Sequence, residues 1–260
     1  MDSMRSSSSS ERDGAIKSAP TLTAKYWRML TLFTCIVGHF IMPSPQRLAV
    51  EDPNTCAYVP GAGFSGFFFT MGRLQTVQEP TSLDYYCYSA GCLASTATLG
   101  NITTGEALSM ALNAQEQWMN GTISRFDVVS QFVDSMIAVG QERTLNAKVL
   151  SKLRIITTKS NGWLQQRETV IRTPKSLEDL KTMLVQTTWI PGATGNAFSF
   201  EEHSDGAFSS ATHPSCPTTV GLPQLSRKTF SFFANLLNMN LKPAQAHAFS
   251  KSGMELGLQR

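Results

Sequence analysis

The spacing of hydrophobic positions changes several times along the chain, and each change marks an expected element. Between residues 55 and 190, short apolar runs alternate with stretches in which apolar residues recur every three or four positions. Short runs are typical of buried strands and the longer spacing is typical of amphipathic helices. The pattern predicts strands at 56–59, 83–88, 153–158 and 168–172, and helices at 64–74, 90–99, 108–118, 126–139 and 176–186.

The order of these elements predicts the fold class. Strand 56–59 precedes a helix, and strand 83–88 runs into helix 90–99 with almost no loop. Consecutive strand–turn–helix units build a parallel sheet covered by helices, so we expect an α/β domain. Residues 189–217 look like a loop, and we expect a short strand at 218–222 and a helix at 230–239.

The first 43 residues differ in character from the rest. Residues 1–25 contain five consecutive serines and interrupted charges, a composition that predicts a disordered tail. Residues 26–43 include an uncharged apolar run, Met29–Met42, that comes after Lys25 and Arg28. A membrane-spanning helix needs about 20 apolar residues, so this shorter run indicates an uncleaved targeting or anchoring segment. A helix packed against the domain is the alternative.

Length and charge narrow the classes of protein further. A chain of 260 residues suits one domain, expected at 52–225, with a helical tail at 226–260. The net charges of residues 1–50, 51–220 and 221–260 are +3, −4 and +4. Lysine and arginine form no block, so we expect no nucleic-acid partner. The five cysteines are odd in number and scattered, and we expect most of them to be small buried hydrophobic residues rather than a disulfide framework.

A glycine-rich turn, Pro60–Gly66, separates the first strand from its helix. Glycines let a turn present consecutive N–H groups, and the helix N-terminus adds a positive dipole end, so the turn suits a phosphate or an oxyanion. No Lys-Ser/Thr pair comes after it, as a P-loop would require. The turn matches G-x-G-x-x-G formally but lacks an acidic ribose partner, which leaves nucleotide binding as a minor alternative.

Ser89 lies between a strand and a helix in the segment Cys87–Gly91. This is the position of a nucleophile elbow, a sharp turn that exposes the serine Oγ beside a helix N-terminus. A serine at that place is also the usual helix N-cap, and this structural interpretation stays open.

A third segment, His203–Ala207, contains an Asp-Gly pair in the expected loop. Asp205 is a candidate general base for Ser89. His203 and His213 offer an alternative partner in a Ser-His-Asp arrangement, although a hydrogen-bonded or solvated histidine is the simpler interpretation of both. The cysteine and histidine spacings predict no metal site.

In this order, the segments resemble the patatin-like phospholipase family, specifically its adiponutrin and adipose triglyceride lipase branch. The resemblance runs from about Cys56 to Ala207. It rests on the loop 61–66, the elbow 88–91, the stretch Trp189–Gly192 and the pair Asp205-Gly206.

The resemblance implies a three-layer α/β fold with a mostly parallel central sheet flanked by helices. It implies a Ser–Asp dyad without a cofactor or metal, with Ser89 as nucleophile and Asp205 as proton acceptor. The backbone N–H groups of Gly61, Ala62 and Gly63 would form the oxyanion hole, and Cys87 and Gly91 would flank the nucleophile in the elbow. Such an enzyme would hydrolyse glycerolipid esters as a lipase or phospholipase.

Among the departures from the family pattern that bear on activity, two lie in the elbow and in the glycine loop. Cys87 replaces the first glycine of the elbow, where strand and helix backbones approach closely, and is expected to fit less well. Ala62 replaces the middle glycine of the loop and tolerates a positive φ less readily. A catalytically weak or inactive lipid-binding relative is therefore the alternative function.

The expected partners are a glycerolipid substrate and a membrane or lipid-droplet surface. The localisation expected is membrane-associated, at the endoplasmic reticulum or a lipid droplet, with secretory targeting as an alternative. Phenylalanines near basic residues in 230–242 would suit a lipid surface or pack on the domain. Asn101-Ile102-Thr103 and Asn120-Gly121-Thr122 are glycosylation sequons, usable only if this part of the chain is lumenal.

Overall fold

The structure is a computed structural model, and it describes residues 47–48, 50, 55–159, 167–209, 213–220 and 243–256. The predictions for residues 1–43 and for a helix at 230–239 lie outside these residues. Within the described part of the chain, no helix is long and apolar enough to cross a membrane.

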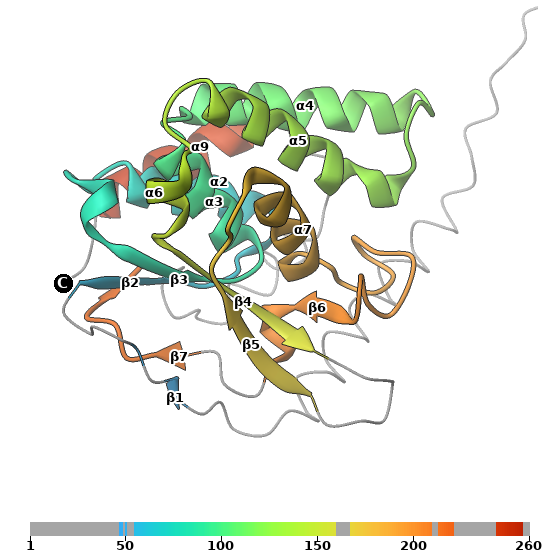
Figure 1. Ribbon diagram of the computed structural model, residues 1–260. Helices are drawn as coiled ribbons and strands as arrows, with labels where there is room; N and C mark the ends of the chain where they lie inside the picture. The colour runs from blue at the N-terminus through green and yellow to red at the C-terminus, as the bar shows by residue number, and fades with distance from the viewer. Residues whose placement is uncertain are drawn as a thin grey trace, which may run out of the picture.

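A mixed six-stranded sheet of mostly parallel strands, flanked by helices, forms the centre of the molecule (Figure 1). Its strand order is β5-β4-β3-β2-β8, and β6 pairs with β4. The strands are β2 (Cys56–Val59), β3 (Asp84–Cys87), β4 (Leu153–Lys159), β5 (Glu168–Arg172), β6 (His203–Asp205) and β8 (Thr218–Thr219). β5 and β6 are antiparallel to β4, and the other pairs are parallel. The α/β class is confirmed.

The helices of the structure include all five that were predicted between residues 64 and 186, together with a short helix at 147–150 and one at 243–256. They are α2 (Gly63–Leu74), α3 (Ala90–Leu99), α4 (Thr104–Met119), α5 (Val128–Gln141), α6 (Ala147–Leu150), α7 (Leu177–Thr187) and α9 (Pro243–Leu256). Short 3-10 helices lie at η1 (Pro80–Ser82), η2 (Arg125–Asp127) and η3 (Gly206–Phe208). In Figure 1, α4 and α5 form the outermost layer, at the opposite end of the molecule from the small sheet of β1 (Arg47–Leu48) and β7 (His213–Pro214).

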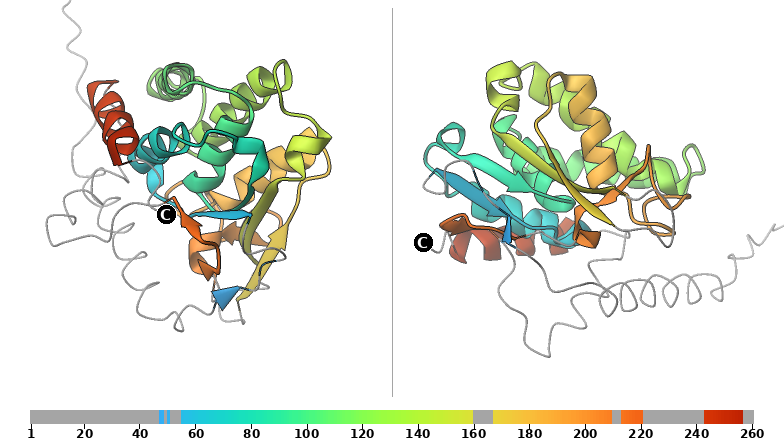
Figure 2. Two further views of the ribbon diagram at one scale, coloured as in Figure 1. Left: turned by 90° about the vertical axis from the view of Figure 1, so that its left-hand side faces the viewer. Right: turned by 60° about the horizontal axis from the view of Figure 1, so that its bottom comes forward.

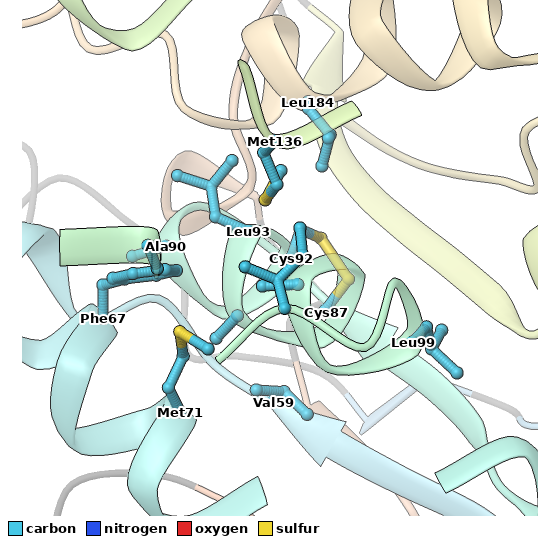
Figure 3. Close-up of a cluster of buried hydrophobic side chains, with 14 of the residues drawn as sticks. Val59, Phe67, Met71, Cys87, Ala90, Cys92, Leu93, Leu99, Met136 and Leu184 are labelled. Atoms are coloured by element: carbon cyan, nitrogen blue, oxygen red, sulfur yellow. A yellow bond between two sulfur atoms is a disulfide. The ribbon is translucent and has the colours of Figure 1, made fainter. Parts of the chain in front are cut away.

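Both faces of the central strands are buried, which explains their continuous apolar runs. Alternate residues of β2 and β3 enter two different clusters. The larger cluster contains Ala57, Val59, Tyr85 and Cys87, together with the inner faces of the helices (Figure 3). The smaller one contains Cys56, Tyr58 and Tyr86 on the other face.

Helix α9 packs along α2 through small residues (Figure 2). A side chain at Gly72 would meet the backbone oxygen of Ser250 at 2.0 Å, and one at Gly253 would meet that of Phe69 at 2.1 Å. Only glycine allows two helix backbones to approach this closely. The two glycines therefore allow α9, which lies in the range 226–260, to pack closely on α2, the first helix of the α/β domain.

The expectation of a loop over 189–217 is wrong in part, because this stretch contains β6, η3 and β7. His213, expected in a loop, lies in β7 opposite Arg47. These strands have two or three residues each, too few to show a spacing in the sequence.

Candidate active site

Ser89 lies at the turn between β3 and α3, in a conformation that serine rarely adopts. Its φ and ψ are 52° and −138°, and its side chain makes no capping hydrogen bond although it holds the N-cap position of α3. Such backbone angles cost about 1–3 kcal/mol and persist only where the surrounding structure imposes them. Ser89 therefore occupies the N-cap position without capping the helix, and its strand–turn–helix setting is the one that a nucleophile elbow requires.

Gly91 and Gly61 give the backbone the space that this turn needs. A side chain at Gly91 would meet the Val59 carbonyl oxygen at 2.2 Å, because the start of α3 lies directly on the end of β2. A side chain at Gly61 would meet the Ser89 Cβ at 2.7 Å. The glycine loop and the elbow are thus in contact.

Cys87, which stands at the first position of the elbow segment, is bonded to Cys92. The disulfide connects the last residue of β3 to the first turn of α3, and both cysteines are fully buried. A second disulfide links Cys56 to Cys216. The prediction that most cysteines are buried is confirmed for Cys56, Cys87 and Cys92, but the expectation that they form no disulfide framework is wrong. The spacing of the cysteines in the sequence contains no sign of which pairs form.

Asp205 lies near Ser89 because β3 and β6 run toward each other along the same edge of β4 and end close together. β3 ends with Cys87 opposite Ile155, and β6 ends with Asp205 opposite Thr157. These two positions on β4 are two residues apart, which corresponds to about 7 Å along a strand. The chain leaves the sheet after β3, and β6 pairs with the next residues along the same edge of β4.

The Asp205 carboxyl is completely buried, and several hydrogen bonds fix its position. The Asp205 backbone N–H donates to the Trp189 carbonyl at 2.9 Å, and the Asp205 carbonyl accepts from the Thr158 hydroxyl at 2.9 Å. Its Oδ1 accepts the Ala207 N–H at 2.8 Å. A side chain at Gly206 would meet the Ile156 carbonyl oxygen at 2.5 Å, so close packing requires the glycine of the Asp-Gly pair.

The second carboxyl oxygen of Asp205 is the one available to Ser89. Oδ2 has no hydrogen-bond partner of regular geometry among the described residues. The Ser89 hydroxyl is close enough to the carboxyl to lower its pKa. Burial outweighs this effect and raises the pKa of Asp205 to about 7. A carboxyl with that pKa accepts a proton readily near neutral pH.

Thr187 holds the backbone of Ser89, a role that was not predicted from the sequence. Its hydroxyl accepts the Ser89 N–H at 2.9 Å and donates to the Ile156 carbonyl at 2.7 Å. It thereby connects the elbow to β4 from the end of α7. The one sequence signal was its place just before Trp189–Gly192.

The three predicted oxyanion residues have different roles in the structure. Gly61 faces Tyr88, whose pKa burial raises to about 12 and whose hydroxyl interacts with the Gly61 backbone. Ala62 is the N-cap of α2 with a φ of −142°, and the positive φ falls on Gly63, at 63°. The expected strain at Ala62 is thus absent, because the next residue takes the left-handed conformation.

Gly63 borders the pocket with Ser89, and Ala90 does so as well. Gly63 and Ala90 are the first residues of α2 and α3, and first-turn N–H groups have no acceptor within their own helix. An elbow uses the N–H of the residue after the nucleophile as one oxyanion donor. Ala90 is therefore a candidate donor that was not predicted from the sequence.

Ser89 opens into a pocket with about 990 Å³ of empty space, including the part open to solvent. Its walls are mostly apolar and come from α2, α3, α4, α5 and the segment after α7. They include Phe64, Phe67, Leu93, Ala111, Val129 and Phe132. Arg125 is the one charged residue among the described lining residues, and burial lowers the pKa of its guanidinium. Such a pocket suits an acyl chain.

The histidine alternatives are separated from this constellation. His203 forms a 2.9 Å hydrogen bond with the Thr157 hydroxyl through Nδ1 and does not line the pocket. Burial, with help from Arg172 and Lys159, lowers its pKa to about 4. His213 pairs with β1 and His247 is exposed on α9, while His39 lies outside the described residues. Among the described residues, no three His, Cys, Asp or Glu side chains gather as a metal site.

Comparisons with protein-family models, with curated proteins and with solved structures found no match to this chain.

Proposed function

We propose that the protein is a serine acyl hydrolase of patatin-like fold that cleaves glycerolipid esters through a Ser89–Asp205 dyad. One observation carries this proposal. Ser89 holds a costly backbone conformation, leaves its helix uncapped, and lies beside a buried carboxyl oxygen that lacks any other partner among the described residues. Strain that serves no structural interaction is a sign of function.

The chemistry is set by the arrangement of these groups. Asp205 accepts the Ser89 hydroxyl proton as Oγ bonds to the ester carbonyl carbon, and the carbonyl π electrons move onto oxygen. The N–H groups of Gly63 and Ala90 would stabilise that oxyanion, a contribution of about 10²–10³ in rate per donor. Collapse of the tetrahedral intermediate releases the alcohol, which takes the proton from Asp205. Water then enters by the same route and releases the fatty acid.

The pocket supports a long acyl chain over a small acyl group. Aromatic and aliphatic side chains from four helices line it, and Ser89 lies at its wall. Burial of each additional methylene is worth about 0.8 kcal/mol, so we expect kcat/KM to rise with chain length. Hydrolysis of p-nitrophenyl esters of increasing acyl length, from butyrate to laurate, measures this dependence.

An alkyl fluorophosphonate probe tests the nucleophile directly. The protein in mixed lipid micelles should be labelled, and Ser89→Ala should abolish the labelling while retaining the thermal unfolding midpoint. Ser109→Ala is the matched control, because the Ser109 hydroxyl donates to the Gly105 carbonyl within α4 and does not line the pocket. Absence of labelling in a folded, lipid-presented protein would contradict the proposal. Retained fatty-acid binding in that case would identify a lipid-binding protein.

A further inference from the structure

Every cysteine that the structure describes is part of a disulfide. Cys56 at the start of β2 is bonded to Cys216, which is 160 residues away and just before β8. Cys87 is bonded to Cys92 across the elbow. Disulfides form and persist in oxidising environments and are rare in proteins of a reducing cytosol. Two independent bridges therefore indicate that this chain folds in an oxidising compartment.

Two glycosylation sequons lie on the surface at the two ends of one helix. Asn101-Ile102-Thr103 directly precedes α4, and Asn120-Gly121-Thr122 directly succeeds it. Both asparagines and both threonines are exposed. The 16 residues of α4 separate the two sites by about 24 Å.

The surroundings of Asn120 leave room for a large modification. A side chain built at Gly121, which has a φ of +78°, would meet nothing within 4 Å. The Asn120 Oδ1 accepts both the N–H and the hydroxyl of Thr122, at 3.1 and 2.6 Å, within a local turn. At Asn101 the backbone carbonyl accepts a hydrogen bond from the Arg143 side chain at 2.7 Å. This contact uses the main chain of Asn101 and not the side-chain amide that a glycan would modify.

Neither sequon blocks the pocket beside Ser89. Asn101 and Asn120 are not among its lining residues, although Ala111 and Gln115 of the same helix are. Outward-facing glycans at the ends of α4 are thus compatible with an open pocket.

We propose that the chain enters the secretory pathway and carries N-linked glycans on Asn101 and Asn120. Each glycan would come from a polyprenyl-diphosphate-linked oligosaccharide. The side-chain Nδ2 bonds to the anomeric carbon, the bond from that carbon to the phosphate oxygen breaks, and the Nδ2 proton leaves as the polyprenyl diphosphate departs. The N-terminal sequence agrees with this route, because Lys25 and Arg28 precede the apolar run 29–42, as in a segment that directs the rest of a chain across a membrane.

Glycosidase treatment of the full chain secreted or retained by cultured animal cells tests the two sites. Peptide N-glycosidase should shift the wild-type band in two steps during partial digestion. Asn101→Gln and Asn120→Gln should each remove one step, and the double variant both. Thr122→Ser should retain both steps because it keeps the sequon. Asn113→Gln is the matched control, since Asn113 is exposed on α4 outside any sequon.

A second measurement addresses the compartment without using the sequons. Peptide mapping after alkylation of unreduced protein should recover the pairs Cys56–Cys216 and Cys87–Cys92. One glycosidase step or none would overturn the assignment of both sites, and alkylation of all four cysteines would overturn the oxidising compartment. Neither readout depends on Ser89 chemistry, so this proposal and the proposed hydrolase can fail separately.

Discussion

Ser89 and Ser176 hold the same position before a helix, yet the structure uses them in opposite ways. Ser176 precedes α7 with extended backbone angles of −145° and 171°, and its side chain accepts the Asp179 N–H at 3.1 Å. Ser89 precedes α3 with a positive φ and caps nothing. A capping serine contributes about 1 kcal/mol to stability, which Ser89 forgoes. Ser176 therefore stabilises its helix directly, whereas Ser89 makes no capping hydrogen bond to its own helix.

The partner atoms of the two serines explain this difference. Ser176 is satisfied by its own helix, and Asp179 in turn accepts the Lys175 N–H. Ser89 is held from outside, by Thr187 on its N–H and by Gly61 and Gly91 through close packing. The conformation of Ser89 is therefore imposed by tertiary contacts.

The largest expected effect comes from removing the charge of Asp205. Asp205→Asn keeps an oxygen for the Ala207 N–H but cannot accept the Ser89 proton, so ester turnover should fall by about 10³-fold or more. Activity and probe labelling measure this loss. Asp179→Asn, beside Ser176, is the control that should leave turnover unchanged, and similar losses in both variants would contradict the distinction between the two serines.

The pH dependence of Asp205 should affect activity and stability in opposite directions. Its folded pKa of about 7 lies above the unfolded value of about 3.9, so the folded state holds its proton more tightly. Turnover should rise as pH passes through about 7 and the carboxylate forms. Stability should fall between about pH 4 and 7 and stay lower above that range.

Asp205→Asn should therefore raise the unfolding midpoint at about pH 8 and change it little at about pH 4, which calorimetry can measure. A flat rate profile from about pH 5 to 9 in the wild type, under conditions where chemistry limits the rate, would be incompatible with Asp205 as the base.

Thr187→Val should have the next largest effect, because it removes the acceptor for the Ser89 N–H without changing side-chain volume much. We expect kcat to fall by about tenfold, the effect of about 1.4 kcal/mol, with KM nearly unchanged, and Thr187→Ser to restore it. Thr98→Val is the control, since the Thr98 hydroxyl donates within α3, to the Ala94 carbonyl. A change confined to stability in Thr187→Val would assign this residue a purely structural role.

Opening the elbow disulfide should lower stability more than activity. Cys92→Ser removes a cross-link that closes a loop of a few residues, worth about 2 kcal/mol in the chain-entropy description. Denaturant unfolding measures this difference, and labelling at low temperature shows whether the elbow persists. Unchanged stability would indicate that the glycine contacts alone hold the turn.

The smallest effect is expected at Ser176. Ser176→Ala should lower the free energy of unfolding by about 1 kcal/mol and leave probe labelling intact. Asn146→Ala, at the N-cap of α6, should behave in the same way, because the Asn146 side chain accepts the Lys148 and Val149 N–H groups. Together with Ser89→Ala, which should change labelling and barely change stability, these variants test both sides of the comparison.

Much of the fold was predictable because it depends on local pattern. The bounds of β2, α3 and β5 agree with the apolar spacing, and Ser176 caps α7 through a bond to a residue three positions away. β6 was not predictable, because three residues cannot show a spacing and its pairing with β4 joins residues such as Ser204 and Thr158, which are 46 positions apart. The same dependence on distant partners hid the cysteine pairs and the role of Thr187.

The sequence by itself determined the α/β class, the main helices and strands, and Ser89 and Asp205 as candidates. Hydrophobic periodicity and short motifs carry that information because they act over a few residues. Only the tertiary structure decided that Ser89 does not cap its helix, that the last residue of β6 meets the end of β3, and that Asp205 loses its contact with water. Those outcomes depend on which distant strands share an edge of β4, and burial at that edge sets the pKa of Asp205.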